Sequence, residues 1–232
     1  MNLIIDRFFN TYSIFLNILL VININFILIF SLILSVYIIQ LISNLTFNIS
    51  KTHPKLFKIV EQLHGFYWAT IIIITPLIPT PTLQNFIFIV IFTVIGFIIG
   101  GVGLYLLIQF SMTNKHWSLG DFSKSDSEGL YTKGIYGFVR HPGYLGFVFG
   151  FIGWSFIWKS VYCIILSPLF LILIIWVSTF EEKVLLIPEF GDEYFKYKKN
   201  TPAFFNMPVT IVFLILLVFV LTMVFFGIMP LV

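Results

Sequence analysis

Long apolar runs restrict the fold of this chain more than any other feature of its sequence. Runs of about 20 residues with almost no charge recur along the 232 residues, for example at 26–42, 85–110 and 207–231. A helix of that length crosses a hydrocarbon core about 30 Å thick. Because lipid offers the backbone no hydrogen-bond partners, a spanning segment is either a helix or part of a closed barrel. The runs are continuous rather than alternating, so we predict an all-α, multi-pass integral membrane protein.

Composition and charge agree with this class of protein. Only 10% of the residues are charged and 59% are hydrophobic, whereas soluble domains carry roughly 25% charged residues. The net charge of +3 is small, and we expect no nucleic-acid partner. Cys163 is the one cysteine in the chain, which excludes an internal disulfide and a four-cysteine metal site. No metal site is predicted.

We predict about six transmembrane helices, within a range of five to seven, in three regions. Residues 1–110 hold the N-terminal transmembrane helices, 111–205 form the core that carries the polar motifs, and 206–232 form a C-terminal transmembrane helix. The first segment, 1–20, either spans the membrane or lies in its interface. The expected helices after it are 26–42, 60–79, 85–110, 143–158, 161–180, an interfacial amphipathic helix within 181–205, and 207–231.

The basic residues lie mostly in loops that this threading places on one side of the membrane. The loops 43–59, 111–142 and 181–206 hold eleven of the thirteen Lys and Arg residues. Cytoplasmic loops carry an excess of Lys and Arg, so these loops are predicted to face the cytoplasm. The membrane is expected to be the endoplasmic reticulum in a eukaryote or the cell membrane in a prokaryote.

Two glycines in the run 85–110 indicate close helix contact. Gly96 and Gly100 are one helical turn apart, the small-xxx-small spacing that lets membrane helices approach closely. The sequence leaves open whether this face packs on another helix or brings a cofactor close to the backbone.

The most informative polar residues flank a predicted helical hairpin. Arg140 and His141 precede the helix that begins near Pro142, a residue suited to a first helical turn. Glu181 and Glu182 end the second helix of the hairpin. The hairpin therefore returns the carboxylates to the membrane face that holds the basic pair. Each residue alone could be a membrane anchor, a helix cap or a solvated helix end, but two adjacent carboxylates need cations or donors nearby to ionise.

The run Arg140-His141-Pro142-Gly143-Tyr144-Leu145-Gly146 resembles the signature of the isoprenylcysteine carboxyl methyltransferase and phospholipid methyltransferase superfamily. The resemblance continues upstream through 124–126 and 130–136, and downstream through 181–182 and 190–202. It covers about residues 120–205, over a third of the chain. The order and spacing of these pieces carry the resemblance, since Arg-His-Pro alone is a weak signal.

This resemblance implies a methyltransferase that uses S-adenosylmethionine as its cofactor in a cytosol-facing pocket. The pocket would be built from the hairpin and the interfacial helix. The resemblance implies that Arg140, Glu181 and Glu182 act in catalysis, with Arg140 orienting a substrate carboxylate or binding the cofactor. The residues expected to bind the cofactor are Leu130, Gly134, Tyr136, His141, Pro142, Tyr144, Glu181 and Glu182.

Three functions remain open at this stage. The first is O-methylation of a C-terminal isoprenylcysteine or a similar prenyl-like lipid acid, and the second is N-methylation of a phospholipid such as phosphatidylethanolamine. The third is a transporter or non-catalytic scaffold, but transporters place ionisable groups near mid-membrane, whereas here they gather at one face. The expected partners are the lipid bilayer and a lipidic or prenylated substrate. The oligomeric state is left open.

Overall fold

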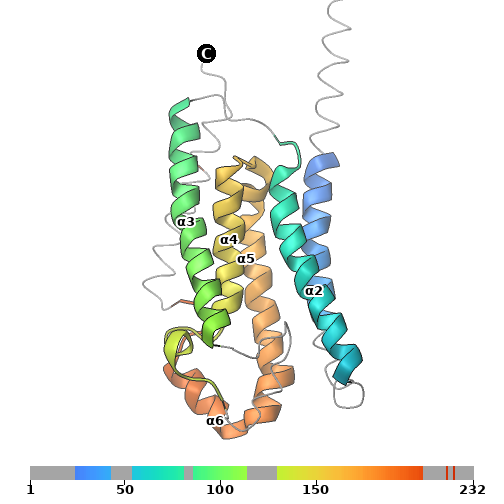
Figure 1. Cartoon of the computed structure of the whole chain (residues 1–232), viewed down its shortest axis with the longest axis vertical. Helices are drawn as coiled ribbons and strands as arrows, with labels where there is room; N and C mark the ends of the chain where they lie inside the picture. The colour runs from blue at the N-terminus through green and yellow to red at the C-terminus, as the bar shows by residue number, and fades with distance from the viewer. Residues whose placement is uncertain are drawn as a thin grey trace, which may run out of the picture.

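The computed structural model describes residues 24–42, 54–80, 86–113 and 130–205, and the single positions 218 and 222. The regular elements of these residues are all helices, which confirms the predicted all-α fold (Figure 1). Three described helices are long and apolar enough to cross a membrane: Ile24–Ile42, Phe86–Thr113 and Val161–Asn200. The expected segment 1–20 lies outside the described residues, as does the run 207–231 except for two positions, so the number of spans stays a prediction.

The predicted hairpin is present, with boundaries close to the expected ones. Helix α4 begins at Pro142, and α4 and α5 are joined by a tight turn at Lys159, whose φ is 54°. The helix expected at 60–79 begins earlier and ends in a 3-10 turn before Pro79. The described elements are α2 (Pro54–Ile74), η2 (Thr75–Leu77), α3 (Phe86–Thr113), η3 (Gly134–Gly137), α4 (Pro142–Ile157), α5 (Val161–Glu181), the π-helical turn η4 (Glu182–Leu186) and α6 (Ile187–Asn200).

Helices α3 and α4 lie side by side and touch through glycines (Figure 1). A Cβ atom built on Gly153 would lie 2.3 Å from the backbone nitrogen of Gly100, and one on Gly96 would lie 2.8 Å from the carbonyl oxygen of Gly153. A Cβ on Gly103 would lie 2.5 Å from the nitrogen of Gly150. The backbones therefore pack directly on each other, which favours the helix-packing interpretation of this glycine pattern.

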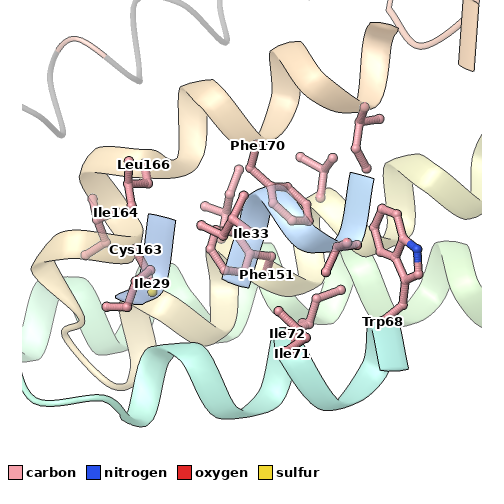
Figure 2. Packing of buried hydrophobic residues seen from close by; sticks show 14 of the residues in the cluster. Ile29, Ile33, Trp68, Ile71, Ile72, Phe151, Cys163, Ile164, Leu166 and Phe170 are labelled. Atoms are coloured by element: carbon pink, nitrogen blue, oxygen red, sulfur yellow. The ribbon is translucent and has the colours of Figure 1, made fainter. Parts of the chain in front are cut away.

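A mixed aliphatic and aromatic core joins the other helices (Figure 2). Ile33 comes from the helix Ile24–Ile42, Trp68 from α2, Phe151 from α4 and Phe170 from α5. The rings of Phe151 and Phe170 stack with centroids 4.4 Å apart, and Trp68 meets Phe170 edge-on at 6.2 Å. The hydroxyl of Tyr37 donates to the carbonyl oxygen of Phe170 at 2.8 Å. This core fixes α5 against its neighbours and so sets the position of the two glutamates at its end.

The helical run Val161–Asn200 is too long to lie entirely within a membrane. Its 40 residues would extend about 60 Å as one straight helix, twice the thickness of a hydrocarbon core. The apolar part, 161–180, is the spanning part, and the polar residues from Glu181 onward lie beyond it. The π-helical turn and Gly191, with φ 50° and ψ −125°, interrupt the run. The chain thereby bends, and α6 lies across the end of the bundle (Figure 1).

Candidate functional site

The loop before α4 is held by the segment after α6, residues 201–205, which we call the strap. The backbone nitrogen of Arg140 donates to the carbonyl oxygen of Pro202 at 2.9 Å, and that of His141 donates to Ala203 at 3.2 Å. These bonds fix the loop that bears the basic pair. The strap thus lies against a loop that is about 60 residues earlier in the sequence. Both segments lie beside the end of α5.

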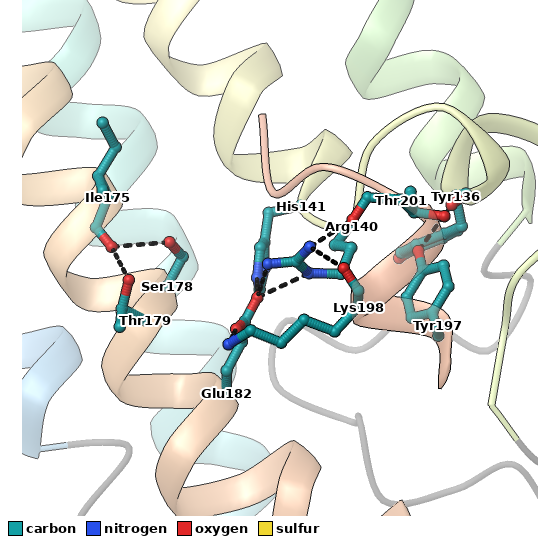
Figure 3. A network of polar contacts seen from close by, with 10 residues as sticks. All are labelled: Tyr136, Arg140, His141, Ile175, Ser178, Thr179, Glu182, Tyr197, Lys198 and Thr201. Carbon is teal, nitrogen blue, oxygen red and sulfur yellow. Dashed lines mark hydrogen bonds and ion pairs between the residues drawn. The ribbon is translucent and has the colours of Figure 1, made fainter. Parts of the chain in front are cut away.

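Glu182 is the centre of a polar network at this end of the bundle (Figure 3). Its Oε1 atom lies 2.8 Å from both Nε and Nη2 of Arg140 and 3.0 Å from Nε2 of His141. Its Oε2 atom accepts a hydrogen bond from Nζ of Lys198 at 2.6 Å. The side chain is only 3% exposed. Both carboxylate oxygens are therefore occupied by basic groups of the protein itself.

The basic neighbours of Glu182 also set its protonation state. Burial alone would raise the pKa of this carboxyl. Hydrogen bonds from His141 and Lys198, the charge of His141 and a hydrogen bond from Arg140 outweigh that effect, and the pKa of Glu182 lies well below its usual value. Glu182 is therefore an anion under physiological conditions.

Arg140 uses its remaining donors on the end of α6. Its Nη1 atom donates to the carbonyl oxygen of Lys198 at 3.3 Å and to that of Thr201. Carbonyl groups in the last turn of a helix have no partner within the helix, and a cation there also interacts favourably with the helix dipole. The Arg140 guanidinium, whose side chain is 8% exposed, therefore links the motif loop, the end of α5 and the end of α6.

The imidazole of His141 lies against two aromatic rings. The centroid of Tyr144 is 5.8 Å away and that of Phe204 is 5.7 Å away, with interplanar angles of 34° and 30°. Nε2 contacts Glu182. Because an anion accepts that contact, Nε2 carries a proton. The ring is thus held in one orientation by contact with two tilted rings and by a charge-assisted hydrogen bond.

Glu181 has different surroundings from its neighbour Glu182. Its side chain is fully buried, with 1% exposure of the residue. Its Oε2 atom has no hydrogen-bond partner among the described residues. The groups that interact with its carboxyl group include His141 and Tyr144. Glu181 is therefore a buried carboxyl group with unused hydrogen-bonding capacity beside the histidine.

The other residues expected in the cofactor pocket lie on the same segment as Arg140. Gly134 has a φ of 60°, which a side chain would strain, and it begins η3. The carbonyl oxygen of Tyr136 accepts a hydrogen bond from the hydroxyl of Tyr197 at 2.6 Å. Pro142 is buried in the first turn of α4, and Leu130 is half-buried at the start of this described stretch. Their role in cofactor binding stays a prediction.

The structure adds residues that the sequence patterns did not single out. Lys198 completes the ion pairs of Glu182, and Phe204 covers the His141 ring. Lys198 and Thr201 lie within the stretch that carries the family resemblance, but a linear pattern does not say which carboxylate or guanidinium they meet. These contacts can be identified only once the fold shows that α6 and the strap return to the loop before α4.

Comparisons with known proteins find similar sequences over the part of the chain that holds this site. The family model described as phospholipid methyltransferase matches residues 88–193, which include α4, α5 and the two glutamates. Residues 88–193 are therefore similar to the phospholipid methyltransferase family. The chain is 37% identical over 80 residues to protein-S-isoprenylcysteine O-methyltransferase of Mus musculus, a match that covers 34% of this chain and 28% of the relative. The enzyme of that name from Schizosaccharomyces pombe is 34% identical over 80 residues, which cover 32% of this chain and 31% of the relative.

The human protein-S-isoprenylcysteine O-methyltransferase is 37% identical over 84 residues, with 34% of this chain and 28% of the relative covered. The chain thus spans less than a third of the length of the curated relatives it matches. No solved structure gives a significant match. The match to the methyltransferase family model ends at residue 193, before Lys198 and the strap. These later residues nevertheless hold the segment Arg140-His141-Pro142 in place.

Proposed function

We propose that this protein is a membrane methyltransferase that uses S-adenosylmethionine and methylates the carboxyl group of an isoprenylcysteine or a similar prenyl-like lipid acid. The observation that carries the proposal is the meeting of Arg140, His141, Glu181 and Glu182 at one end of the hairpin, within a region that matches the methyltransferase family. The names of the curated relatives favour the isoprenylcysteine substrate over a phospholipid.

The residues present fit the cofactor. S-adenosylmethionine carries a sulfonium, an ammonium and a carboxylate, and when bound it supplies an electrophilic methyl group. The buried Oε2 atom of Glu181 lacks a partner among the described residues and suits a cation. His141 interacts with the Glu181 carboxyl group, and α4 begins at the next residue, Pro142; a helix N-terminus favours an anionic group. The pocket would also include Gly134, Tyr136 and Tyr144, with Leu130 at its edge.

The protein's own residues would act mainly by placing the two reactants. A carboxylate substrate is already ionised at neutral pH, so the site needs no strong base. Correct placement of two reactants contributes a large part of many rate enhancements. Arg140 and Glu182 hold α6 and the strap over the loop, and these segments exclude water from the site. Arg140 is also the candidate for orienting the substrate carboxylate.

A two-acceptor assay tests the proposal. Purified protein in lipid nanodiscs is incubated with S-adenosylmethionine labelled in its methyl group, together with either a farnesylcysteine analogue or phosphatidylethanolamine. Label that enters the farnesylcysteine and is released as methanol by mild alkali identifies a carboxyl methyl ester. Alkali-stable label in the phospholipid would instead support the second candidate, phospholipid N-methylation, which the name of the matching family model favours. Transfer to neither acceptor would contradict both.

The location of the site is a part of the proposal. The described segments that hold the site, 130–142 and 181–205, carry six Lys and Arg residues, and by the positive-inside rule such segments face the cytoplasm. The substrate's lipid tail would remain in the bilayer while its polar end reaches the site sideways. Such an approach needs no water-filled path through the protein.

A further inference from the structure

The strap leads the chain away from the site along helix α4. The backbone nitrogen of His141, just before α4, donates to the carbonyl oxygen of Ala203. Two residues later the ring of Phe205 contacts that of Phe149, with centroids 6.0 Å apart. Phe149 is about 12 Å further along the axis of α4 than His141. The chain therefore leaves the strap in the direction of α4, toward the apolar part of the bundle.

The side of α4 that carries Phe149 packs against protein. Leu145, Ile152 and Phe156 share this side, because helical positions three and four apart lie on one face. Their exposed fractions are 4%, 6% and 2%. A position of this bundle that faces lipid is far more open, as the 65% exposure of Phe97 on α3 shows. This side of α4 is therefore suited to contact with a further apolar segment where Phe205 reaches it.

The segment that follows the strap has the length and composition to continue along α4. Residues 207–231 contain no charged residue, and as a helix they would extend about 37 Å, enough to cross the hydrocarbon core. The two described positions, Val218 and Thr222, are helical and exposed. The hydroxyl of Thr222 donates to the carbonyl oxygen of Val218 at 2.8 Å. This hydroxyl is thus satisfied within its own helix and can face lipid.

The two exposed positions also indicate which face of the segment is turned inward. Successive residues of a helix point about 100° apart, so Val218 and Thr222 lie about 40° apart on one face. The residues on the opposite face are all apolar. They are Val209, Phe213, Leu216 and Val220.

We propose that residues 207–231 pack along the Phe149 side of α4 with this inward face against it, and that they thereby anchor the strap over the loop that bears Arg140 and His141. The strap is not helical, so its position depends on what holds its two ends. Helix α6 holds the first end, and the docked segment holds the second. The covalent link through Phe205 gives this segment a high effective concentration at the surface, which neither lipid nor a second copy of the chain has.

Disulfide crosslinking of the full chain in membranes tests the docking. In a Cys163→Ala background, whose thermal midpoint is checked first, Ile152→Cys is combined with one further cysteine at a time, and copper phenanthroline oxidises the pairs that meet. A crosslink within one chain should form with at least one inward position, tested as Val209→Cys, Phe213→Cys and Leu216→Cys. The matched outward controls are Ile211→Cys, Leu214→Cys and Val218→Cys. Crosslinks to an outward position, crosslinks between two chains, or no crosslink at all would overturn the proposal.

A photocrosslinking amino acid keeps the proposal testable if the cysteine pairs do not fold. The aromatic residue p-benzoylphenylalanine replaces Phe213 or, as the matched control, Phe225, which lies two turns beyond Val218 on the outward face. After irradiation in nanodiscs, mass spectrometry should find position 213 linked to an α4 peptide of the same chain and position 225 linked to lipid. Products of position 213 that contain no α4 peptide, or products of position 225 that do, would contradict the docking.

Hydrogen exchange measures the anchoring separately from the docking. A flexible Gly-Ser insertion between Asn206 and Met207 keeps both parts of the chain but uncouples them. The amide groups of Arg140 and His141 donate to the strap, so their exchange should become several-fold faster in this variant. The same insertion in the connection between α2 and α3 is the control and should leave their exchange unchanged. Unchanged exchange in the first variant would overturn the anchoring. None of these measurements requires methyl transfer, so the inference can fail or hold independently of the proposed function.

Discussion

Arg140 shows how one side chain can connect segments that are distant in the sequence. Its guanidinium contacts Glu182 with two nitrogens and the carbonyl oxygens of Lys198 and Thr201 with the third. The planar guanidinium presents five N–H donors in a fixed arrangement, whereas a lysine ammonium is a compact point charge with three. The geometry of the site therefore depends on the shape of this cation as well as on its charge.

The first prediction concerns Arg140→Lys. The substitution keeps the positive charge but cannot reach Glu182 and both carbonyl groups together, so the methyl-transfer rate should fall about tenfold or more. The thermal midpoint should fall too, because a buried acceptor is left unsatisfied. Arg140→Ala should be at least as damaging. Lys133→Ala, in the same loop but exposed, serves as the control. A rate within twofold of the unmodified protein in Arg140→Lys would show that charge alone suffices.

A second prediction concerns the basic partners of Glu182, whose side chains differ in burial. The side chain of Lys198 is 39% exposed, and exposed ion pairs contribute only about 0–1 kcal/mol. Lys198→Gln should therefore lower the free energy of unfolding far less than Glu182→Gln, for which breaking a buried pair costs about 3–5 kcal/mol. Reversible unfolding in mixed detergent micelles measures both. Equal losses would mean that Lys198, rather than Arg140, is the main partner.

At the scale of the helices, close backbone contact and local hydrogen bonding determine the packing. Helix α4 has 16 residues and packs on α3 through direct backbone contact at glycines, and the rings of Phe92 and Phe156 also meet across this interface. Helix α5 contains Pro168 in its interior. A proline removes one backbone N–H donor, so the carbonyl group four residues earlier, that of Ile164, loses its helical partner. The hydroxyl of Ser167 donates to that carbonyl oxygen at 2.7 Å.

The α3–α4 contact predicts opposite effects for two neighbouring glycines of α4. A Cβ at Gly153 would overlap the backbone of Gly100, whereas a Cβ at Gly150 meets no atom within 4 Å. Gly153→Ala should destabilise the protein by about 1–3 kcal/mol through overpacking. Gly150→Ala should be neutral or stabilising, because alanine favours helix by about 1 kcal/mol over glycine. Denaturation of the two variants under identical conditions compares them, and equal behaviour would contradict the observed packing.

The compensation at Pro168 can be tested by a double-mutant cycle. Ser167→Ala leaves the buried carbonyl of Ile164 without a partner, at a cost of about 1–3 kcal/mol. In a Pro168→Ala background the new backbone N–H can bond to that carbonyl, so the same serine substitution should cost much less. The free energy of unfolding of the four proteins gives the coupling. Equal costs in both backgrounds would show that the serine acts independently of the proline.

At the scale of the whole molecule, the sequence predicts the helices far better than their contacts. Helical length and apolar runs predicted α4 and α5 to within a few residues, because lipid restricts spanning segments to so few forms. The hairpin also predicted that Arg140 and His141 would meet the two glutamates, although it did not predict which glutamate Arg140 pairs with. The contacts of Lys198 and Phe204 did not follow from the hairpin, since they depend on the direction in which α6 leaves the π-helical turn. Small changes in local backbone geometry determine that direction, and the periodicity of apolar residues in the sequence does not predict it.

The final prediction concerns the orientation of the whole molecule in its membrane. Cys163 is the one cysteine in the chain and is fully buried, so a membrane-impermeant maleimide should not react with it. Cysteines are introduced singly at the exposed positions Lys133, in the loop before α4, and Trp158, at the α4–α5 turn. Because the basic loops should face the cytoplasm, Trp158→Cys should be labelled in intact bacteria that carry the protein in their cell membrane. Lys133→Cys should be labelled only after the membrane is permeabilised. The reverse pattern would place Arg140 and the glutamates on the outer face, where a cytosolic cofactor cannot reach them, and the proposed function would then be wrong.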